Sequence, residues 1–313
     1  IRLPFFNPYY NHKINIFKDY LKRTQPDILH SFGFDYYGFW GSKADFSPHI
    51  ATVLGSDISE SKMTTSKKKR IITAANADCI HLHDKYGQKR ILELGANPRK
   101  VHIHQWGVDT KFYNPNFKSE KVRKTIIGDN KFLITCIRNL NPLYNLPIFL
   151  NAAHKILQSH PKTHFLLVGE GEQRKELENL AIGLGIEAQV TFTGGVSSKR
   201  VATFLACSDI VVDTYQTKHG GGGIGMGLLE AMASGVPPVT VSNPWIDDFM
   251  TTHNVGHKYK GGDVSDLVSK LVKLLDDHRR KILGEKCREV VLKHYNWQDS
   301  INKIKVLYNE LNK

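Results

Sequence analysis

The feature that most constrains the fold is a series of short apolar runs after residue 130, separated by amphipathic stretches. These runs predict strands at 131–140, 163–171, 189–196, 209–215 and 237–241. Helices are predicted at 146–158, 172–185, 197–208 and 225–234, and the last 50 residues also have a helical pattern. Strands that lack polar alternation and are joined by helices form parallel sheets covered on both faces. This half is therefore predicted to be a doubly wound α/β domain.

The first part of the chain shows the same pattern of apolar runs and helical stretches, but less regularly. Strands are predicted at 28–32, 48–58, 77–84 and 100–109, and a helix at 86–95. Residues 110–130 contain Pro115 and several charges without a sustained period, so they are predicted to be a linker. A chain of 313 residues is long enough for two domains. We therefore expect one α/β domain over 1–120 and a second over 121–313.

The charge balance favours an anionic partner. The chain has 43 Lys and Arg against 30 Asp and Glu, a formal net charge of +13. The densest basic run, Lys67–Arg70, is either a solvated helix face or a contact for anions. No interleaved aromatic motif for RNA accompanies it, so phosphorylated ligands or an anionic membrane surface are favoured over nucleic acid.

The cysteines and the hydropathy pattern indicate in which cellular compartment the protein lies. The four cysteines, Cys79, Cys136, Cys207 and Cys287, form no C-x-x-C pair, which favours reduced thiols over disulfides or a zinc site. No run of about 18 apolar residues is present. The sequence therefore predicts a cytoplasmic protein that lies at most on a membrane surface.

The stretch 218–235, KHGGGGIGMGLLEAMASG, has six glycines in eight positions before a helix that carries one acid, Glu230. Glycines are costly to order, so such a loop is either flexible or approached closely by a ligand. Free backbone N–H groups at the start of a helix bind phosphate, which makes Gly225, Met226 and Gly227 candidates for a diphosphate contact. Glu230 is either a solvent-facing helix residue or an acceptor for the two hydroxyls of a ribose.

Other candidate groups follow the predicted strands. In open α/β sheets, ligands bind beyond the carboxyl ends of the strands, here after Asn139, Gly169, Gly194 and Tyr215. Arg138 ends its strand and is either a surface arginine or a partner for phosphate charge. Gly220, Gly222 and Gly225 formally fit G-x-G-x-x-G, but this loop comes late in the sheet, which disfavours a Rossmann dehydrogenase.

These segments together resemble the family 4 glycosyltransferases. The resemblance covers nearly the whole chain and depends most on Gly107-Val108-Asp109 followed by Tyr113 and Pro115, and on LLEAMASG at 228–235. It implies a GT-B architecture, with two Rossmann-like domains facing each other across a cleft, and a last helix that packs back on the first domain. It also implies retaining transfer of a sugar from a nucleotide diphosphate without a metal. The family's first strand and its Gly-Gly loop should precede Ile1, so we expect roughly 50–70 residues to be absent, as judged by ordinary domain sizes.

The resemblance also assigns residue roles. Arg138 matches the arginine that meets the donor phosphates, and Glu230 matches the glutamate expected on the ribose; these two are the catalytic candidates. Gly195 and Val196 match the loop beside the base. The full set of expected donor contacts is Arg138, Tyr144, Gly169, Gly195, Val196, Gly222, Gly223, Ile224, Gly225, Met226, Gly227 and Glu230.

Three positions depart from the family pattern. Tyr144 stands where a lysine usually contributes a second phosphate charge. Gly222 stands where the first glutamate of an E-x7-E motif usually contacts the sugar, and Leu54 stands where a histidine often ends a strand. Backbone amides could replace the carboxylate that is missing at Gly222, since retaining transfer without a protein nucleophile depends mainly on positioning and phosphate stabilisation.

Two functions from different classes remain at this stage. The first is a retaining glycosyltransferase that uses a UDP- or GDP-sugar and a glycan or lipid-linked acceptor at the inner face of the cell membrane, with no cofactor and no metal. The alternative is a non-catalytic nucleotide-sugar-binding protein of the same fold, since Gly222 and Leu54 replace usual site residues. His81, His83, His102 and His104 alternate along two predicted strands, but no carboxylate partner for a metal accompanies them.

Overall fold

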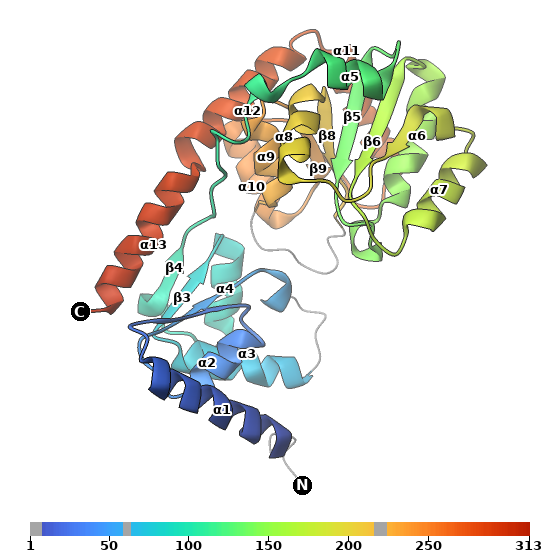
Figure 1. The fold of residues 1–313 in the computed structure, drawn as a ribbon. Coiled ribbons are helices and arrows are strands. Elements are labelled where there is room, and N and C mark those ends of the chain that lie inside the picture. Colours follow the sequence, from blue (N-terminus) through green and yellow to red (C-terminus); the bar gives the residue numbers. More distant parts are fainter. Residues whose placement is uncertain (1–7, 59–63, 216–223) are drawn as a thin grey trace. The chain divides into compact units, whose positions relative to one another are not determined.

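The computed structural model describes residues 8–58, 64–215 and 224–313. The chain divides into two compact α/β units (Figure 1), and each is considered by itself. The first unit includes the chain up to Gln105 together with Ser300–Lys313, and the second includes Trp106–Lys218 and Ile224–Asp299. The sequence prediction put the domain boundary at 120/121, whereas the compact units divide between Gln105 and Trp106.

The first unit is built on a parallel sheet of order β1-β2-β3-β4. Its strands are β1 (Leu29–Phe32), β2 (His49–Thr52), β3 (Cys79–Leu82) and β4 (Val101–Ile103). Its helices are α1 (Pro8–Thr24), α2 (Tyr37–Lys43), α3 (Thr64–Asn76) and α4 (Lys85–Glu93). Every residue of β2 and β3 is buried, as expected for central strands of a parallel sheet. From α13 (Trp297–Leu311), Leu307 packs with Ile50 and Cys79.

The second unit has a six-stranded parallel sheet of order β10-β9-β8-β5-β6-β7. Its strands are β5 (Phe132–Ile137), β6 (Thr163–Val168), β7 (Val190–Phe192), β8 (Ile210–Asp213), β9 (Pro238–Val241) and β10 (His257–Tyr259). Its helices are α5 (Glu120–Ile127), α6 (Pro147–Ser159), α7 (Arg174–Gly183), α8 (Ser198–Cys207), α9 (Met226–Ala233), α10 (Pro244–His253), α11 (Val264–Asp276) and α12 (Arg280–His294). The strand order reverses between β5 and β8, which marks the position where open α/β sheets bind ligands.

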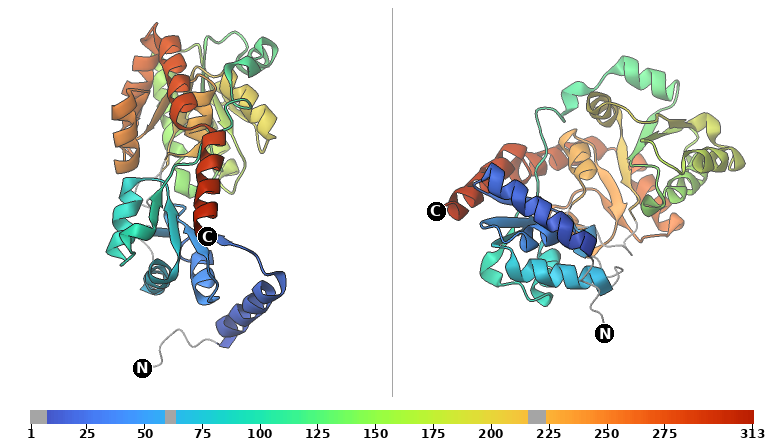
Figure 2. Two further views of the ribbon diagram at one scale, coloured as in Figure 1. Left: turned by 90° about the vertical axis from the view of Figure 1, so that its left-hand side faces the viewer. Right: turned by 60° about the horizontal axis from the view of Figure 1, so that its bottom comes forward.

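Alternate residues of β5 pack into separate cores on the two faces of this sheet. Ile134 and Cys136 belong to a core formed with α6, α7 and α11, whereas Leu133 packs against α5 and α8. Figure 2 shows α11 (orange) and α8 (yellow) on opposite sides of the sheet. The prediction of a doubly wound α/β domain with helices on both faces is therefore confirmed.

The expected linker at 110–130 contains a regular helix. The Ser119 hydroxyl accepts a hydrogen bond from the Val122 N–H and caps α5, and Ile127 is buried against the sheet. An eight-residue helix gives little periodicity to detect, so its cap was the more informative signal.

Two crossing segments of the chain lie side by side within the second unit. The Val108 N–H donates to the Tyr295 carbonyl at 2.8 Å, and the Trp297 N–H donates to the Val108 carbonyl at 3.0 Å. A Cβ atom at Gly107 would lie 2.4 Å from the Asn296 backbone, so this close approach requires glycine. The segment Gly107-Val108-Asp109 thus has a structural role, because Val108 pairs with the backbone at residues 295–297.

The four cysteines are unpaired thiols, as the sequence analysis expected, and all four are buried. Burial raises the pKa of Cys79, Cys136 and Cys287 to about 12, so these thiols stay protonated and pack as small apolar groups. Among the described residues, no helix is both long and apolar enough to cross a membrane.

Candidate functional site

The candidate site lies beyond the carboxyl ends of β5 and β8, at the reversal of strand order. Arg138 follows the last residue of β5, and Asp213 ends β8. The Arg138 Nε and Nη2 atoms lie 3.0 and 2.8 Å from the same Asp213 oxygen, Oδ1. The strands β5 and β8 are neighbours in the sheet although they are distant in the sequence. Arg138 and Asp213 therefore meet although 75 positions separate them.

Arg138 is mostly buried but retains some access to solvent. Its side chain is 20% exposed and that of Asp213 is 14% exposed. Burial works to lower the pKa of Arg138, but the attraction of Asp213 outweighs it and holds that pKa above its ordinary value. The guanidinium is therefore a permanent cation, held in one orientation by the carboxylate.

Two tyrosines flank this ion pair. The Arg138 guanidinium lies over the Tyr144 ring, with 5.1 Å between Cζ and the ring centroid. The Tyr144 and Tyr215 rings lie 5.9 Å apart, and burial raises the pKa of Tyr215. Tyr144 thus contributes a ring surface to the site, and the Tyr215 phenol remains neutral at physiological pH.

The start of α9 meets Arg138. Gly225 is the residue before this helix, and a Cβ atom placed there would lie 3.2 Å from the Arg138 Nη2. The first N–H groups of a helix have no acceptor within it, and the described residues provide none for the N–H groups of Met226 and Gly227. A guanidinium and two helix N–H groups then point into one region, an arrangement suited to an anion. Ile224, just before Gly225, is buried in a core shared with Leu228 and Leu229.

Glu230 lies one turn further along α9. It is partly buried, and burial raises its pKa, while a hydrogen bond from Tyr113 and the charge of Arg138 oppose that rise. Burial and the neighbouring Glu230 raise the pKa of Tyr113, so its phenol is the hydrogen-bond donor. Glu230 is therefore not a solvent-facing residue, and a carboxylate with one bond from Tyr113 still has acceptor capacity for a ligand.

The remaining predicted contacts follow β6 and β7. The Gly169 N–H donates to the Gly194 carbonyl at 3.2 Å, which joins the two loops next to Gly195. Gly169 has a φ of +143°, and a Cβ atom there would lie 2.1 Å from the Arg138 carbonyl. Only glycine allows the β6 loop to approach Arg138 this closely. Gly195 is exposed and Val196 is partly buried, so the loop borders the same edge of the sheet.

Three residues singled out in the sequence are not placed next to Arg138 by the structure. Gly222 and Gly223 lie outside the described residues. Leu54 belongs to the first unit, where its side chain is 49% exposed and its N–H donates to the Asp57 carboxylate at 3.1 Å.

Two residues of the basic run, and most histidines of the first unit, are engaged in packing, whereas Lys67 and Lys68 are exposed. Arg70 is buried with its Nη2 at 3.8 Å from the Asp35 carboxylate, and Lys69 lies over the rings of Tyr36 and Phe39. His81 contacts the rings of His83 and His104, at centroid distances of 5.3 and 5.7 Å. Within 8–58, 64–215 and 224–313, no three His, Cys, Asp or Glu side chains are grouped as metal ligands.

Sequence reasoning missed Asp213, Tyr215 and Tyr113 as functional groups. Asp213 ends an apolar run, and an acid in that position is the kind of signal that could have suggested a site. Its pairing with Arg138 depends on β8 lying beside β5, which the sequence does not specify.

The comparisons with known proteins identify the family and the fold. The family model for glycosyl transferases group 1 matches residues 117–290. Over 238 residues the chain is 25% identical to the UDP-Gal:alpha-D-GlcNAc-diphosphoundecaprenol alpha-1,3-galactosyltransferase of Escherichia coli, covering 74% of this chain and 59% of that protein. Over 256 residues it is 23% identical to a GDP-mannose-dependent alpha-(1-6)-phosphatidylinositol monomannoside mannosyltransferase of Mycolicibacterium smegmatis, covering 80% of this chain and 66% of that protein.

Among solved structures, the HepE protein of Anabaena in complex with UDP superposes with a TM-score of 0.82 at 16% identity, over 95% of this chain and 82% of that one. This likeness identifies the fold as that of the GT-B proteins and confirms the predicted fold class. The chain spans less than two thirds of the length of either of the two sequence relatives.

Proposed function

We propose that this chain, which belongs to the group 1 glycosyl transferases, moves a sugar from a nucleotide diphosphate sugar to a glycan or lipid-linked acceptor with retention of configuration. The observation that carries the proposal is the meeting of Arg138 with the N-terminus of α9 at the strand-order reversal. A diphosphate is the ligand that both features suit, since each provides donors and positive charge to the same anion.

Each site residue then has a role. Arg138 and the N–H groups of Met226 and Gly227 bind the diphosphate and stabilise the charge that grows on it as the sugar leaves. Glu230, positioned by Tyr113, accepts hydrogen bonds from the ribose hydroxyls. The loop of Gly195 and Val196 borders the base, and Ile224, Gly222 and Gly223 complete the donor contacts. No metal takes part in this scheme.

If the sugar is transferred with retention of configuration and without a protein nucleophile, the site needs few catalytic groups. The leaving phosphate and the acceptor hydroxyl occupy the same face of the sugar, so the protein's contribution is positioning and charge stabilisation. Arg138 is suited to this because Asp213 fixes its orientation before the donor binds. A pre-oriented cation stabilises developing charge without reorganising during the reaction.

For the acceptor we propose a lipid-linked glycan or glycolipid at the inner face of the cell membrane. The galactosyltransferase and mannosyltransferase relatives are named for a diphosphoundecaprenol-linked and a phosphatidylinositol-linked acceptor. The net charge of +13 suits a protein that works beside anionic lipid headgroups.

Calorimetric titration with UDP, GDP, ADP and their common sugar conjugates tests the proposal, followed by a turnover assay with the conjugate that binds. We expect saturable binding of one nucleotide class and its loss in Arg138→Ala, with Arg99→Ala, an exposed arginine of the first unit, as the matched control. Binding without turnover on any lipid-linked acceptor would favour the non-catalytic alternative. A folded sample that binds none of the nucleotides would refute the proposal.

A further inference from the structure

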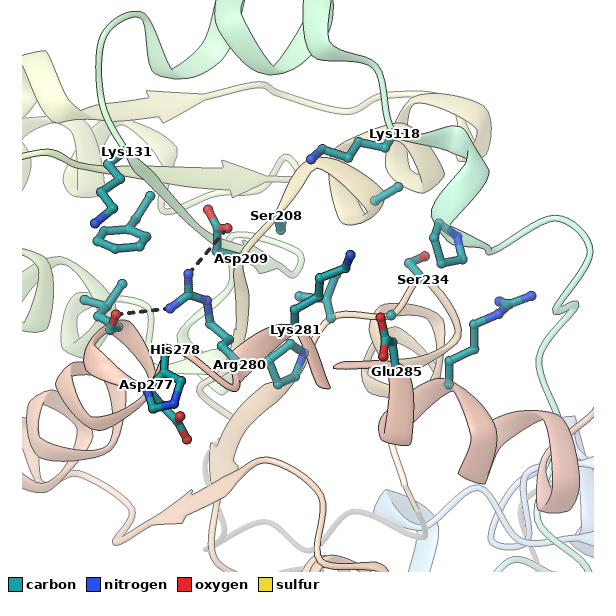
Figure 3. A pocket seen from close by; sticks show the side chains of 18 of the residues that line it. Lys118, Lys131, Ser208, Asp209, Ser234, Asp277, His278, Arg280, Lys281 and Glu285 are labelled. Carbon is teal, nitrogen blue, oxygen red and sulfur yellow. Dashed lines mark hydrogen bonds and ion pairs between the residues drawn. The ribbon is translucent and has the colours of Figure 1, made fainter. Parts of the chain in front are cut away.

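A second cavity lies at the opposite edge of the same sheet, at the amino ends of the strands. It has a volume of about 540 Å³ and is lined by Phe132 at the start of β5, Asp209 just before β8 and Pro237 just before β9 (Figure 3). Arg138 is at the other end of β5, roughly 20 Å away at 3.3 Å per residue. The cavity is therefore separate from the proposed donor site, and its size suits a small organic ligand.

The lining is highly charged and has one more cationic than acidic side chain. The basic residues are Lys118, Lys131, Arg280, Lys281 and Arg288, and the acidic residues are Asp209, Asp276, Asp277 and Glu285. Three of the four acids are already bound. Asp209 pairs with Arg123 at 2.7 Å, Asp276 accepts from His160 at 3.0 Å, and Asp277 accepts from the Arg279 N–H at 2.8 Å. Arg123, His160 and Arg279 are not part of the lining, so these three contacts come from outside it.

Arg280 and Arg288 are held by hydrogen bonds to backbone carbonyls, whereas Lys281 remains available to a ligand. Arg280 donates to the carbonyls of Leu274 and Leu275, and Arg288 donates to the carbonyls of Tyr113 and Ala233. Lys281 is exposed and makes no ion pair within the described part of the chain. Lys118 pairs with Glu120, which is not part of the lining, at 2.9 Å, and both side chains are exposed. Figure 3 shows Lys118 and Lys281 extending from different elements toward the same space.

A buried hydroxyl adds an independent indication of a ligand. Ser234, just after α9, is 3% exposed, and its Oγ has no hydrogen-bond partner among the described residues. A buried polar atom without a partner is costly, and a bound ligand or water removes that cost. Gly284 makes room for this arrangement, because a Cβ atom there would lie 2.0 Å from the Gly235 carbonyl.

We propose that this cavity binds a small phosphorylated molecule, with Lys118 and Lys281 contacting its phosphate and Ser234 donating a hydrogen bond to it. Ammonium groups bind phosphate as mobile point charges, and their convergence on a concave surface favours a compact multivalent anion over a flat one. Glu285 is the lining carboxylate without an ion pair among the described residues, and its charge opposes the ligand.

The test is a calorimetric titration with inorganic pyrophosphate at low ionic strength, carried out on full-length Arg138→Ala so that the donor site does not contribute. We expect one saturable site in this background. Adding Lys281→Ala should weaken its affinity at least fivefold, and adding Glu285→Gln should tighten it two- to fivefold. Lys175→Ala, an exposed lysine of α7 outside the cavity, is the control of equal charge change and should alter the affinity less than twofold.

The gain expected for Glu285→Gln cannot result from partial unfolding, so it separates a binding effect from a stability effect. The proposal is overturned if Arg138→Ala binds no pyrophosphate, because all binding then belongs to the donor site. It is also overturned if Lys281→Ala and Lys175→Ala weaken binding equally, or if Glu285→Gln does not tighten it.

Discussion

Arg138 and Asp213 form an ion pair that joins the carboxyl ends of β5 and β8, with both guanidinium contacts made to a single carboxylate oxygen. This leaves the second oxygen of Asp213 and one nitrogen of Arg138, Nη1, outside the pair. The carboxylate therefore orients the arginine and at the same time offsets part of its charge. A site for a diphosphate would benefit from the first effect and be weakened by the second.

Replacing Arg138 by Ala is expected to lower kcat more than it raises KM for the donor. The charge on the leaving diphosphate is greater in the transition state than in the bound donor, so the lost attraction acts mainly on the chemical step. Steady-state kinetics with the donor found by titration measures the two constants. A change in KM alone would contradict this role, and Arg99→Ala serves as the control.

Asp213→Asn is expected to bind the nucleoside diphosphate two- to tenfold more tightly while lowering kcat. The amide retains a hydrogen-bond acceptor for the Arg138 Nε but no longer offsets its charge, so a bound anion experiences a stronger field. The looser arginine is then less well positioned during transfer. Calorimetry gives the affinity and kinetics the rate; weaker nucleotide binding would show that orientation, and not charge, is the main effect of Asp213.

Glu230→Ala is expected to weaken nucleotide binding about 10- to 100-fold through the loss of two ribose hydrogen bonds. Tyr113→Phe should produce a smaller loss in the same direction, because it removes the hydroxyl that positions Glu230 and leaves the carboxylate in place. A 2′,3′-dideoxy nucleotide should bind the wild type and Glu230→Ala equally. Unchanged affinity for the ordinary nucleotide in Glu230→Ala would remove this residue from the site.

Buried histidines should make the first unit sensitive to acid. Burial lowers the pKa of His30, His49 and His104 to about 4 and that of His81 to about 3, whereas unfolded histidine titrates near 6.5. Below pH 6.5 the unfolded state therefore binds protons that the folded state does not, so stability is full above this pH and falls as the pH decreases toward 4. We expect a loss on the order of 2 kcal/mol for each fully buried histidine between pH 7.5 and 5.

Urea unfolding monitored at several pH values measures this effect. His81→Gln should flatten the pH dependence, because its ring accounts for part of the proton uptake on unfolding. His12→Gln changes an exposed histidine of α1 and should leave the slope as it is. Equal slopes in the wild type and His81→Gln would show that His81 is not held neutral by the fold.

The alternation of apolar runs and amphipathic helices was sufficient to predict most of the second unit, since β6 and β9 are buried throughout and the longer helices show their period. The strand β10 and the helix α10 were not predicted. Arg138, Gly225 and Glu230 could be proposed as a group because they follow strands whose carboxyl ends share one edge. Asp213 and Tyr113 could not, because their roles depend on which strands are neighbours and on the return of a distant loop. The α5 helix was not predicted because it is short, and the boundary at Gln105 and Trp106 depends on contacts between segments distant in the sequence, which no local pattern shows.

The return of the chain into the first unit has a consequence for how the protein responds to cleavage. The described chain passes between the units once at Gln105 and Trp106 and again at Asp299 and Ser300. A protease that cuts the first passage would leave α13 intact, and Leu307 of this helix packs with Ile50 and Cys79 of the other fragment. The two fragments would separate on a denaturing gel but migrate together under native conditions, so a nick in this connection would escape any assay that measures only the mass of the assembled protein.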